Sequence, residues 1–264
     1  MSRVTQPVEV DEQPTGRLSG WLVSGMALPV LIAVIDFVIH MAFSDNYGYF
    51  RDEFYYIAAG HHLAFGYVDF PPMIAVLAAA MNVVAGDNLI AIHVIPALVV
   101  SMLVVVAGLQ ARELGGGRFA QFLSALGTAV IVVFMATGSI FSMDILDALL
   151  WSLVALVLMR LLRTGDQRLW LLIGLIAGIG LTTKVTMLFF GFALAAGLAL
   201  SPSRSSFRSR WLYLGGLIAL VFLLPYLIWN AIHGWPTIEF WQNYGGSGGG
   251  PLGFLGNQIL STNP

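Results

Sequence analysis

Long apolar segments, separated by short polar turns, run through most of this 264-residue sequence and limit its fold more than any other feature. Clear examples are residues 21–43, 89–111 and 211–231. An α-helix needs roughly 20 predominantly apolar residues to cross a bilayer, and each of these segments is long enough. The sequence is therefore expected to fold as an all-α integral membrane protein.

Composition agrees with this expectation and excludes several functions. Hydrophobic residues make up 58% and charged residues 10% of the chain, whereas soluble domains have about 45–50% apolar and about 25% charged residues. The net charge of −2 leaves no basic patch that could neutralise many phosphates, so no nucleic-acid partner is expected. The absence of cysteine excludes a disulfide, a thiol nucleophile and a thiolate metal site.

The apolar pattern predicts about seven transmembrane helices. We expect them at residues 21–43, 89–111, 119–136, 144–162, 169–181, 187–200 and 211–231. The two short segments 169–181 and 187–200 fit either two spans or one bent hairpin within the membrane. Gly174 and Gly178 form a small-residue pair that favours close helix contact. Segment 73–85 is short for a span and fits an interfacial or re-entrant amphipathic helix beside the membrane.

Positive charges predict the orientation. If the spans alternate in direction, every Lys and Arg except Arg51 and Lys184 lies on the side of the N-terminus. The positive-inside rule places that side in the cytoplasm, and we expect a multi-pass protein of the plasma membrane. The expected parts are a disordered cytoplasmic tail at 1–17 and a membrane domain at 18–264, with outer loops at 44–88 and 232–264.

Polar side chains gather on the predicted outer face. Segment 49–72 combines adjacent carboxylates, several tyrosines, two histidines and a double proline, and further polar residues follow in later loops. The candidate site residues are Asp52, Glu53, Tyr55, Tyr56, His61, His62, Asp69, Asp144 and Lys184. Aromatic rings pack against sugar faces, carboxylates bind hydroxyls, and a cation binds phosphate. The set indicates a cleft that handles a sugar or a phosphate.

Asp52 and Glu53 have two interpretations. Carboxylates in a first helical turn satisfy free N–H groups and the helix dipole, and the pattern that follows predicts an amphipathic helix on the bilayer surface. Alternatively, one of the two is a general base, which needs a carboxylate within hydrogen-bond reach of a hydroxyl. Spacing alone does not decide between them.

The other candidates have structural interpretations as well. Adjacent histidines on a helix point about 100° apart, so His61 and His62 are not predicted to bind a metal together. Asp69 precedes the double proline and is expected in a turn, whereas Asp144 fits either the cap of a span or a site. Lys184, alone between two apolar segments, needs an anionic partner such as a lipid head group or a phosphate.

Residues 51–73 resemble the first outer loop of polyprenyl-phosphate-dependent glycosyltransferases of the GT-C fold. Within these, the resemblance is to the bacterial protein O-mannosyltransferases of glycosyltransferase family 39, to which the lipid A aminoarabinose transferases are related. Further landmarks in the same order are Leu-Gly-Gly at 114–116, Asp144 at the start of a span, Gly-Leu-Thr-Thr-Lys at 180–184 and His-Gly-Trp-Pro-Thr at 233–237. The resemblance covers residues 18–264.

This resemblance implies inverting transfer of one sugar from a polyprenyl phosphate to an acceptor hydroxyl on the extracytoplasmic face. It implies that Asp52 is the general base and Glu53 its helper. Asp69 and Asp144 would line the pocket, and Lys184 would meet the donor phosphate. No cofactor is expected, a divalent cation is left open, and the acceptor is a glycan, a lipid or a protein.

Family members are usually much longer, and the sequence stops where a further span is expected. We therefore expect a fragment or one half of a split enzyme, with a partner chain that supplies the C-terminal half. An alternative function is a non-catalytic subunit that binds or transports a lipid-linked sugar. A third is an ion-coupled carrier that uses Asp36 and His40 of the first span as a proton relay, but such carriers need inverted repeats and the sequence shows none.

Overall fold

The computed structural model describes residues 25–46 and 48–244, together with 253 and 256. Within these residues every regular element is a helix. Three of the described helices are both long and apolar enough to cross a membrane, namely α5 (Leu89–Glu113), α8 (Met143–Thr164) and α11 (Arg210–Ile232). The expected all-α membrane fold is thus confirmed.

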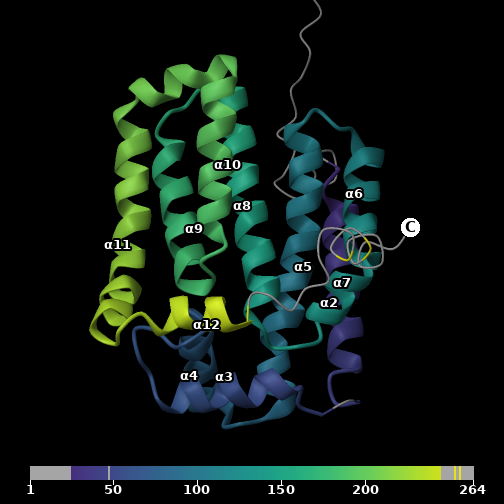
Figure 1. Cartoon of the computed structure of the whole chain (residues 1–264). Coiled ribbons are helices and arrows are strands. Elements are labelled where there is room, and N and C mark those ends of the chain that lie inside the picture. The colour runs from purple at the N-terminus through teal and green to yellow at the C-terminus, as the bar shows by residue number, and fades with distance from the viewer. Residues whose placement is uncertain (1–24, 47, 245–252, 254–255, 257–264) are drawn as a thin grey trace, which may run out of the picture.

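Shorter helices run alongside the long ones (Figure 1). They include α2 (Ala27–Ala42), α9 (Leu169–Thr183) and α10 (Met187–Leu200), of which α10 bends by 113° into the 3₁₀-helix η1 (Pro202–Arg208). α9 and α10 are separate helices that lie beside α8 and α11, as two short spans would. By length and composition, only the three long helices among the described residues could each cross a membrane, and α10 with η1 could form a fourth, broken span. The total of about seven spans therefore stays a prediction.

The expected span at 119–136 is broken in the structure. α6 (Arg118–Val130) and α7 (Val132–Thr137) are separated at Ile131, whose φ of −66° and ψ of 121° are extended rather than helical. Ile131 lies within a run of β-branched residues at 130–133, and such side chains are stiff and lower helix propensity. The expectation of one continuous helix is therefore wrong.

Glycines allow α9 and α11 to pack backbone against backbone. A Cβ atom at Gly174 would lie 2.1 Å from the carbonyl oxygen of Gly215, and one at Gly215 would lie 2.2 Å from the carbonyl oxygen of Trp170. Neither position has room for a side chain, so the close approach requires glycine on both helices. The close helix contact expected at Gly174 is thus confirmed.

The elements that carry the candidate residues gather at one end of the molecule. α3 (Arg51–His61), α4 (Met73–Ala85) and α12 (Pro236–Tyr244) lie at this end, and η1 lies at the other (Figure 1). α4 begins and ends at the residues expected for the short apolar segment. The loops therefore divide between two ends as the charge pattern predicts.

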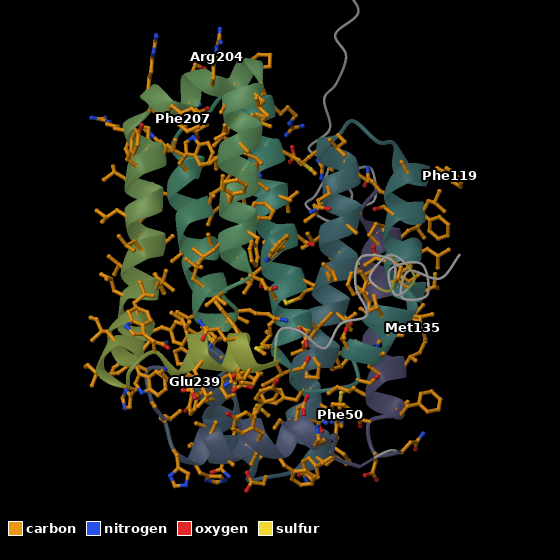
Figure 2. The ribbon with its side chains drawn as sticks, viewed as in Figure 1. Phe50, Phe119, Met135, Arg204, Phe207 and Glu239 are labelled. Atoms are coloured by element: carbon orange, nitrogen blue, oxygen red, sulfur yellow. The ribbon has the colours of Figure 1, made fainter. Side chains whose placement is uncertain are left out.

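The two ends of the molecule also carry different side chains. Figure 2 shows Arg204 at the η1 end, and Phe50 and Glu239 at the opposite end. The side of the membrane that each end faces stays a prediction. The expected tail at 1–17 and most of the expected loop beyond residue 244 lie outside the described residues.

Candidate functional site

One face of α3 forms the first wall of the candidate site. Asp52, Tyr55 and Tyr56 are three and four residues apart, which places them on one side of the helix. Asp52 is partly exposed and forms an ion pair with Arg51 (Nε–Oδ1 2.8 Å), whereas Tyr56 is buried. This face therefore offers an accessible carboxylate beside a buried phenol.

The loop between α3 and α4 folds over this face because Phe70 anchors it. Phe70 is fully buried, and its ring meets the rings of Tyr55 and Tyr56 edge-on at centroid distances of 5.2 and 5.3 Å. Tyr67 stacks on the same ring at 4.7 Å. The adjacent Asp69 accepts a hydrogen bond from the Tyr55 hydroxyl (2.8 Å). The loop thus brings a second carboxylate to the α3 face.

A third carboxylate and a cation come from other helices. Asp144 lies in the first turn of α8, where its backbone N–H donates to the Ser142 hydroxyl (3.3 Å). Ser142 is therefore the helix cap, and the Asp144 carboxylate is available for other contacts. Lys184, in the turn between α9 and α10, donates a hydrogen bond to Oδ1 of Asp144. Both side chains are partly exposed, Asp144 by 53% and Lys184 by 29%.

Carboxylates from three segments lie near the phenol of Tyr56. Burial raises the pKa of Tyr56 most, and the carboxylates of Asp144, Asp52 and Asp69 raise it further. Since charges act in this way only over limited distances, acids from three separate segments lie in the neighbourhood of one phenol. The arrangement offers acceptors for sugar hydroxyls, a carboxylate able to take a proton and an ammonium group able to bind a phosphate.

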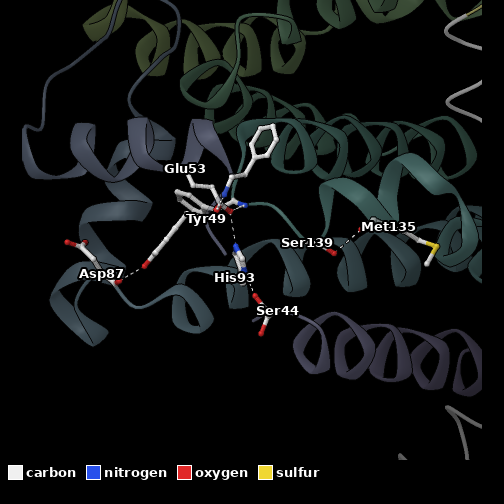
Figure 3. Close-up of polar contacts among 9 residues, drawn as sticks. Ser44, Tyr49, Glu53, Asp87, His93, Met135 and Ser139 are labelled. Carbon is white, nitrogen blue, oxygen red and sulfur yellow. Dashed lines mark hydrogen bonds and ion pairs between the residues drawn. The ribbon is translucent and has the colours of Figure 1, made fainter. Parts of the chain in front are cut away.

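Glu53, the other carboxylate of the α3 start, is fully buried. Figure 3 shows it within a network of hydrogen bonds. Its carboxylate accepts the backbone N–H groups of Phe50 (2.8 Å) and Phe141 (2.6 Å) and contacts Nε2 of His93 (2.9 Å). The other ring nitrogen of His93 lies 3.0 Å from the Ser44 carbonyl oxygen. One side chain thus ties α3 to α5 and to the loop that leads into α8.

His61 and His62 lie at the opposite end of α3 from Asp52, about 14 Å away along the helix. Nε2 of His61 lies 3.2 Å from Oδ2 of Asp87, and Asn82 donates to the other oxygen of that carboxylate (2.8 Å). The structure therefore does not bring this pair to the carboxylate cluster. Among the described residues, no group of three or more His, Cys, Asp or Glu is arranged to hold a metal ion.

Three polar residues at or near the site were not among the sequence candidates. Asp147, one turn beyond Asp144 on α8, accepts a hydrogen bond from the Thr186 hydroxyl (2.6 Å), and His93 bonds the buried carboxylate described above. Asp147 and His93 both lie within predicted spans, where an ionisable residue is a functional candidate by default. That signal could have identified both of them, whereas nothing local singles out Thr186.

Asp36 and His40, the ionisable pair of the first span, are buried in α2. The Ser101 hydroxyl donates to Oδ2 of Asp36 (3.1 Å), and Nε2 of His40 lies 3.3 Å from the Met135 carbonyl oxygen. These contacts join α2 to α5 and α7. They support a structural role for the pair.

The all-α membrane architecture agrees with the GT-C fold that the resemblance implies. The chain belongs to the dolichyl-phosphate-mannose-protein mannosyltransferase family, whose model matches residues 69–229. The matched part contains Asp69, Asp144 and Lys184, and Asp52 precedes it. The family placement expected from the resemblance is thus confirmed.

A curated relative is the lipid A galacturonosyltransferase RgtD of Rhizobium johnstonii, which is 28% identical over 227 residues. The alignment covers 81% of this chain and 46% of the relative. The chain therefore spans about half of the length of this relative. No solved structure matches the chain.

Proposed function

We propose that this chain forms the donor side of an inverting glycosyltransferase site. In this proposal one sugar passes from a polyprenyl phosphate to an acceptor hydroxyl. The observation that carries it is the convergence of three carboxylates around Tyr56, with Lys184 bonded to one of them. Family membership supports a lipid-phosphate donor, because the family is described by dolichyl-phosphate mannose.

Asp52 is the proposed general base because it is the accessible carboxylate at the start of α3. The acceptor oxygen attacks C1 of the sugar while its proton passes to the Asp52 carboxylate. The bond between C1 and the phosphate oxygen breaks, and its electron pair stays on the phosphate. Attack from the side opposite the phosphate inverts the configuration at C1.

Lys184 is the proposed partner of the leaving phosphate. Its ammonium neutralises the charge that develops as the bond to C1 breaks, so the leaving group needs no acid. Because Lys184 is bonded to Asp144, the donor phosphate competes with this carboxylate for the ammonium. Asp69 and Asp144 are proposed to bind sugar hydroxyls. The exposed ring of Tyr55 supplies a surface for the sugar, and the buried ring of Tyr56 fixes the wall behind it.

Glu53 is proposed to act by positioning other groups and not by contact with the substrate. It is fully buried and holds the start of α3 against the loop that leads into α8. This connection fixes the distance between Asp52 and Asp144. His61 and His62 are not included in the proposed site, because they lie at the far end of α3.

The site is proposed to face the extracytoplasmic side of the plasma membrane. The η1 end carries Arg204 and Arg208 in η1 itself and Arg112 in the last turn of α5. The site end carries Arg51 and Lys184. The positive-inside rule favours a cytoplasmic η1 end, which leaves the site on the outside.

The comparisons support a lipid phosphate as the carrier of the sugar but do not agree on the sugar or on the acceptor. The family description combines dolichyl-phosphate mannose with protein, whereas RgtD is named for lipid A and galacturonosyl transfer. These two descriptions differ in both the sugar and the acceptor. We therefore propose a lipid-phosphate donor and an acceptor hydroxyl on a glycan, a lipid or a protein.

A transfer assay tests this function directly. The purified chain in lipid nanodiscs is given dolichyl-phosphate mannose together with a serine-containing peptide and lipid A as candidate acceptors, and the release of dolichyl phosphate is measured. Asp52→Asn is expected to slow the release by about 10²–10⁴-fold, which is the usual contribution of a general base. Asp45→Asn, which changes an exposed carboxylate before α3, is the matched control and is expected to leave the rate unchanged.

The outcomes separate the candidate functions. A wild-type rate in Asp52→Asn would refute the assignment of the base. Donor binding without any turnover by the wild-type chain would instead support a subunit that binds a lipid-linked sugar.

A further inference from the structure

Asp147 connects α8 to the turn that carries Lys184. The hydroxyl of Thr186 donates a hydrogen bond of 2.6 Å to Oδ2 of Asp147. Thr186 follows Lys184 by two residues and directly precedes α10. Since Asp144 lies one turn before Asp147 on the same helix, α8 holds this turn at two points, once through each carboxylate.

The hydroxyl of Thr186 is committed to this contact rather than to its own helix. Thr186 is the N-cap residue of α10, yet its side chain makes no capping hydrogen bond. Threonine at an N-cap normally accepts a hydrogen bond from the first turn of the helix that follows. Here the hydroxyl donates to Asp147 on α8 instead. The hydrogen bond therefore fixes the turn against α8 and does not cap α10.

Asp147 has polar neighbours besides Thr186. The indole N–H of Trp151, one turn further along α8, acts on the same carboxylate, although neither it nor Oδ1 of Asp147 makes a hydrogen bond by distance and angle among the described residues. Lys184 and Asp144 lie close enough to act electrostatically on the same carboxylate. Lys184 therefore lies in the field of two carboxylates but is bonded to only one of them, Asp144.

We propose that Asp147 is a positioning residue for Lys184. By accepting the hydrogen bond from Thr186, it holds the turn between α9 and α10 so that the ammonium of Lys184 points into the site before the donor arrives. A lysine side chain has high rotational freedom, and fixing its backbone lowers the entropy lost when it binds a ligand. The inference rests on the proposed function, in which Lys184 binds the donor phosphate.

The test compares two lipid probes that differ in one group. Binding of a polyprenyl monophosphate and of the uncharged polyprenol of the same length is measured with the full chain in nanodiscs. The ratio of the two affinities reports the phosphate contact alone. Thr186→Val removes the hydroxyl at nearly constant shape and is expected to lower this ratio about tenfold, as expected when one charged contact loses its preorganisation.

Thr186→Ser keeps the hydroxyl and is expected to retain the wild-type ratio. Asp147→Ala is expected to lower the ratio as Thr186→Val does. The double variant is expected to be no worse than either single variant, because both remove one shared contact. Polyprenol affinity is expected to stay unchanged in all of these variants.

Lys184→Ala separates a failure of this inference from a failure of the proposed function. If Lys184→Ala lowers the affinity ratio and Thr186→Val does not, the inference about Asp147 is wrong and the phosphate contact stands. If Lys184→Ala leaves the ratio at the wild-type value, the phosphate role of Lys184 is wrong and the inference fails with it. Equal losses of phosphate and polyprenol binding in Thr186→Val would mark a purely structural contact and would also overturn the inference.

Discussion

The ammonium group of Lys184 donates a hydrogen bond to the carboxylate of Asp144, although the two residues are 40 positions apart in the sequence. The contact joins the turn between α9 and α10 to the first turn of α8. Both side chains remain partly exposed, so a ligand can reach the pair. In the proposed site the cation is therefore already paired before a phosphate arrives, and we expect the strength of this pair to limit donor binding.

Removing the competing carboxylate is expected to strengthen phosphate binding. An exposed ion pair contributes about 0.2–1 kcal/mol, and about 1.4 kcal/mol corresponds to a tenfold change in affinity. Asp144→Asn is therefore expected to bind a polyprenyl monophosphate up to about fivefold more tightly than the wild type. Equilibrium titration in nanodiscs measures this, with Asp45→Asn as the control. Weaker binding by Asp144→Asn would contradict the competition.

The buried network around Glu53 is expected to contribute to stability. Each carboxylate oxygen of Glu53 accepts a hydrogen bond from a backbone N–H group, one from Phe50 and one from Phe141. In Glu53→Gln one of these oxygens becomes an NH₂ group, which cannot accept such a bond. Such a change leaves buried polar groups unsatisfied and is expected to cost about 1–3 kcal/mol of the free energy of unfolding. Unfolding by heat or denaturant in detergent measures the loss. Glu239→Gln, on an exposed part of α12, is the control, and equal stability of the two variants would count against the network.

The contact between α9 and α11 is expected to tolerate no side chain at Gly174. A methyl group there would overlap the backbone of Gly215, and overpacking of this kind typically costs about 1–3 kcal/mol. Gly174→Ala is therefore expected to melt at a lower temperature than the wild type. Gly191→Ala on α10, where a Cβ would have no neighbour within 4 Å, is the control. A melting temperature that is the same in both variants would show that the helices adjust.

Asp87 is expected to make the contact between the ends of α3 and α4 sensitive to acid. Hydrogen bonds hold the pKa of Asp87 below its ordinary value, the bond from Asn82 having a larger effect than that from His61. A carboxyl group with a lowered pKa in the folded state stabilises the fold above its unfolded pKa, and this contribution disappears as the pH falls through the folded pKa. Below about pH 4, the wild type is therefore expected to lose more stability than Asp87→Asn. Parallel melting curves against pH would contradict this expectation.

The helices and the division of the loops could be predicted because apolar length and charge count belong to the sequence itself. α4 has the limits expected from its composition, and α3, which begins at Arg51, lies at the end opposite η1 as the charge pattern predicts. The break at Ile131 could not be placed. β-branched residues weaken a helix over several positions without fixing the point at which it ends.

Within the site, the residue types were predictable but their directions were not. Asp52 and Glu53 are neighbours, and the pattern around them does not show which one is buried. The burial of Glu53 depends on His93 and Phe141, which are 40 and 88 positions away. Asp147 could have been identified as an ionisable residue within a span, but its partner Thr186 could not, because it is 39 positions away.

The hydrogen bond between Phe141 and Glu53 also sets an order of events during synthesis. α3 leaves the ribosome long before the segment that satisfies its buried carboxylate, since the two residues are 88 positions apart. Glu53 gains His93 as a partner when α5 is made and the Phe141 N–H only after that, so we expect α3 to reach its final position late. The turn with Lys184 is made later still. Lys184, the proposed phosphate-binding cation, is therefore the last charged residue of the proposed site to be made.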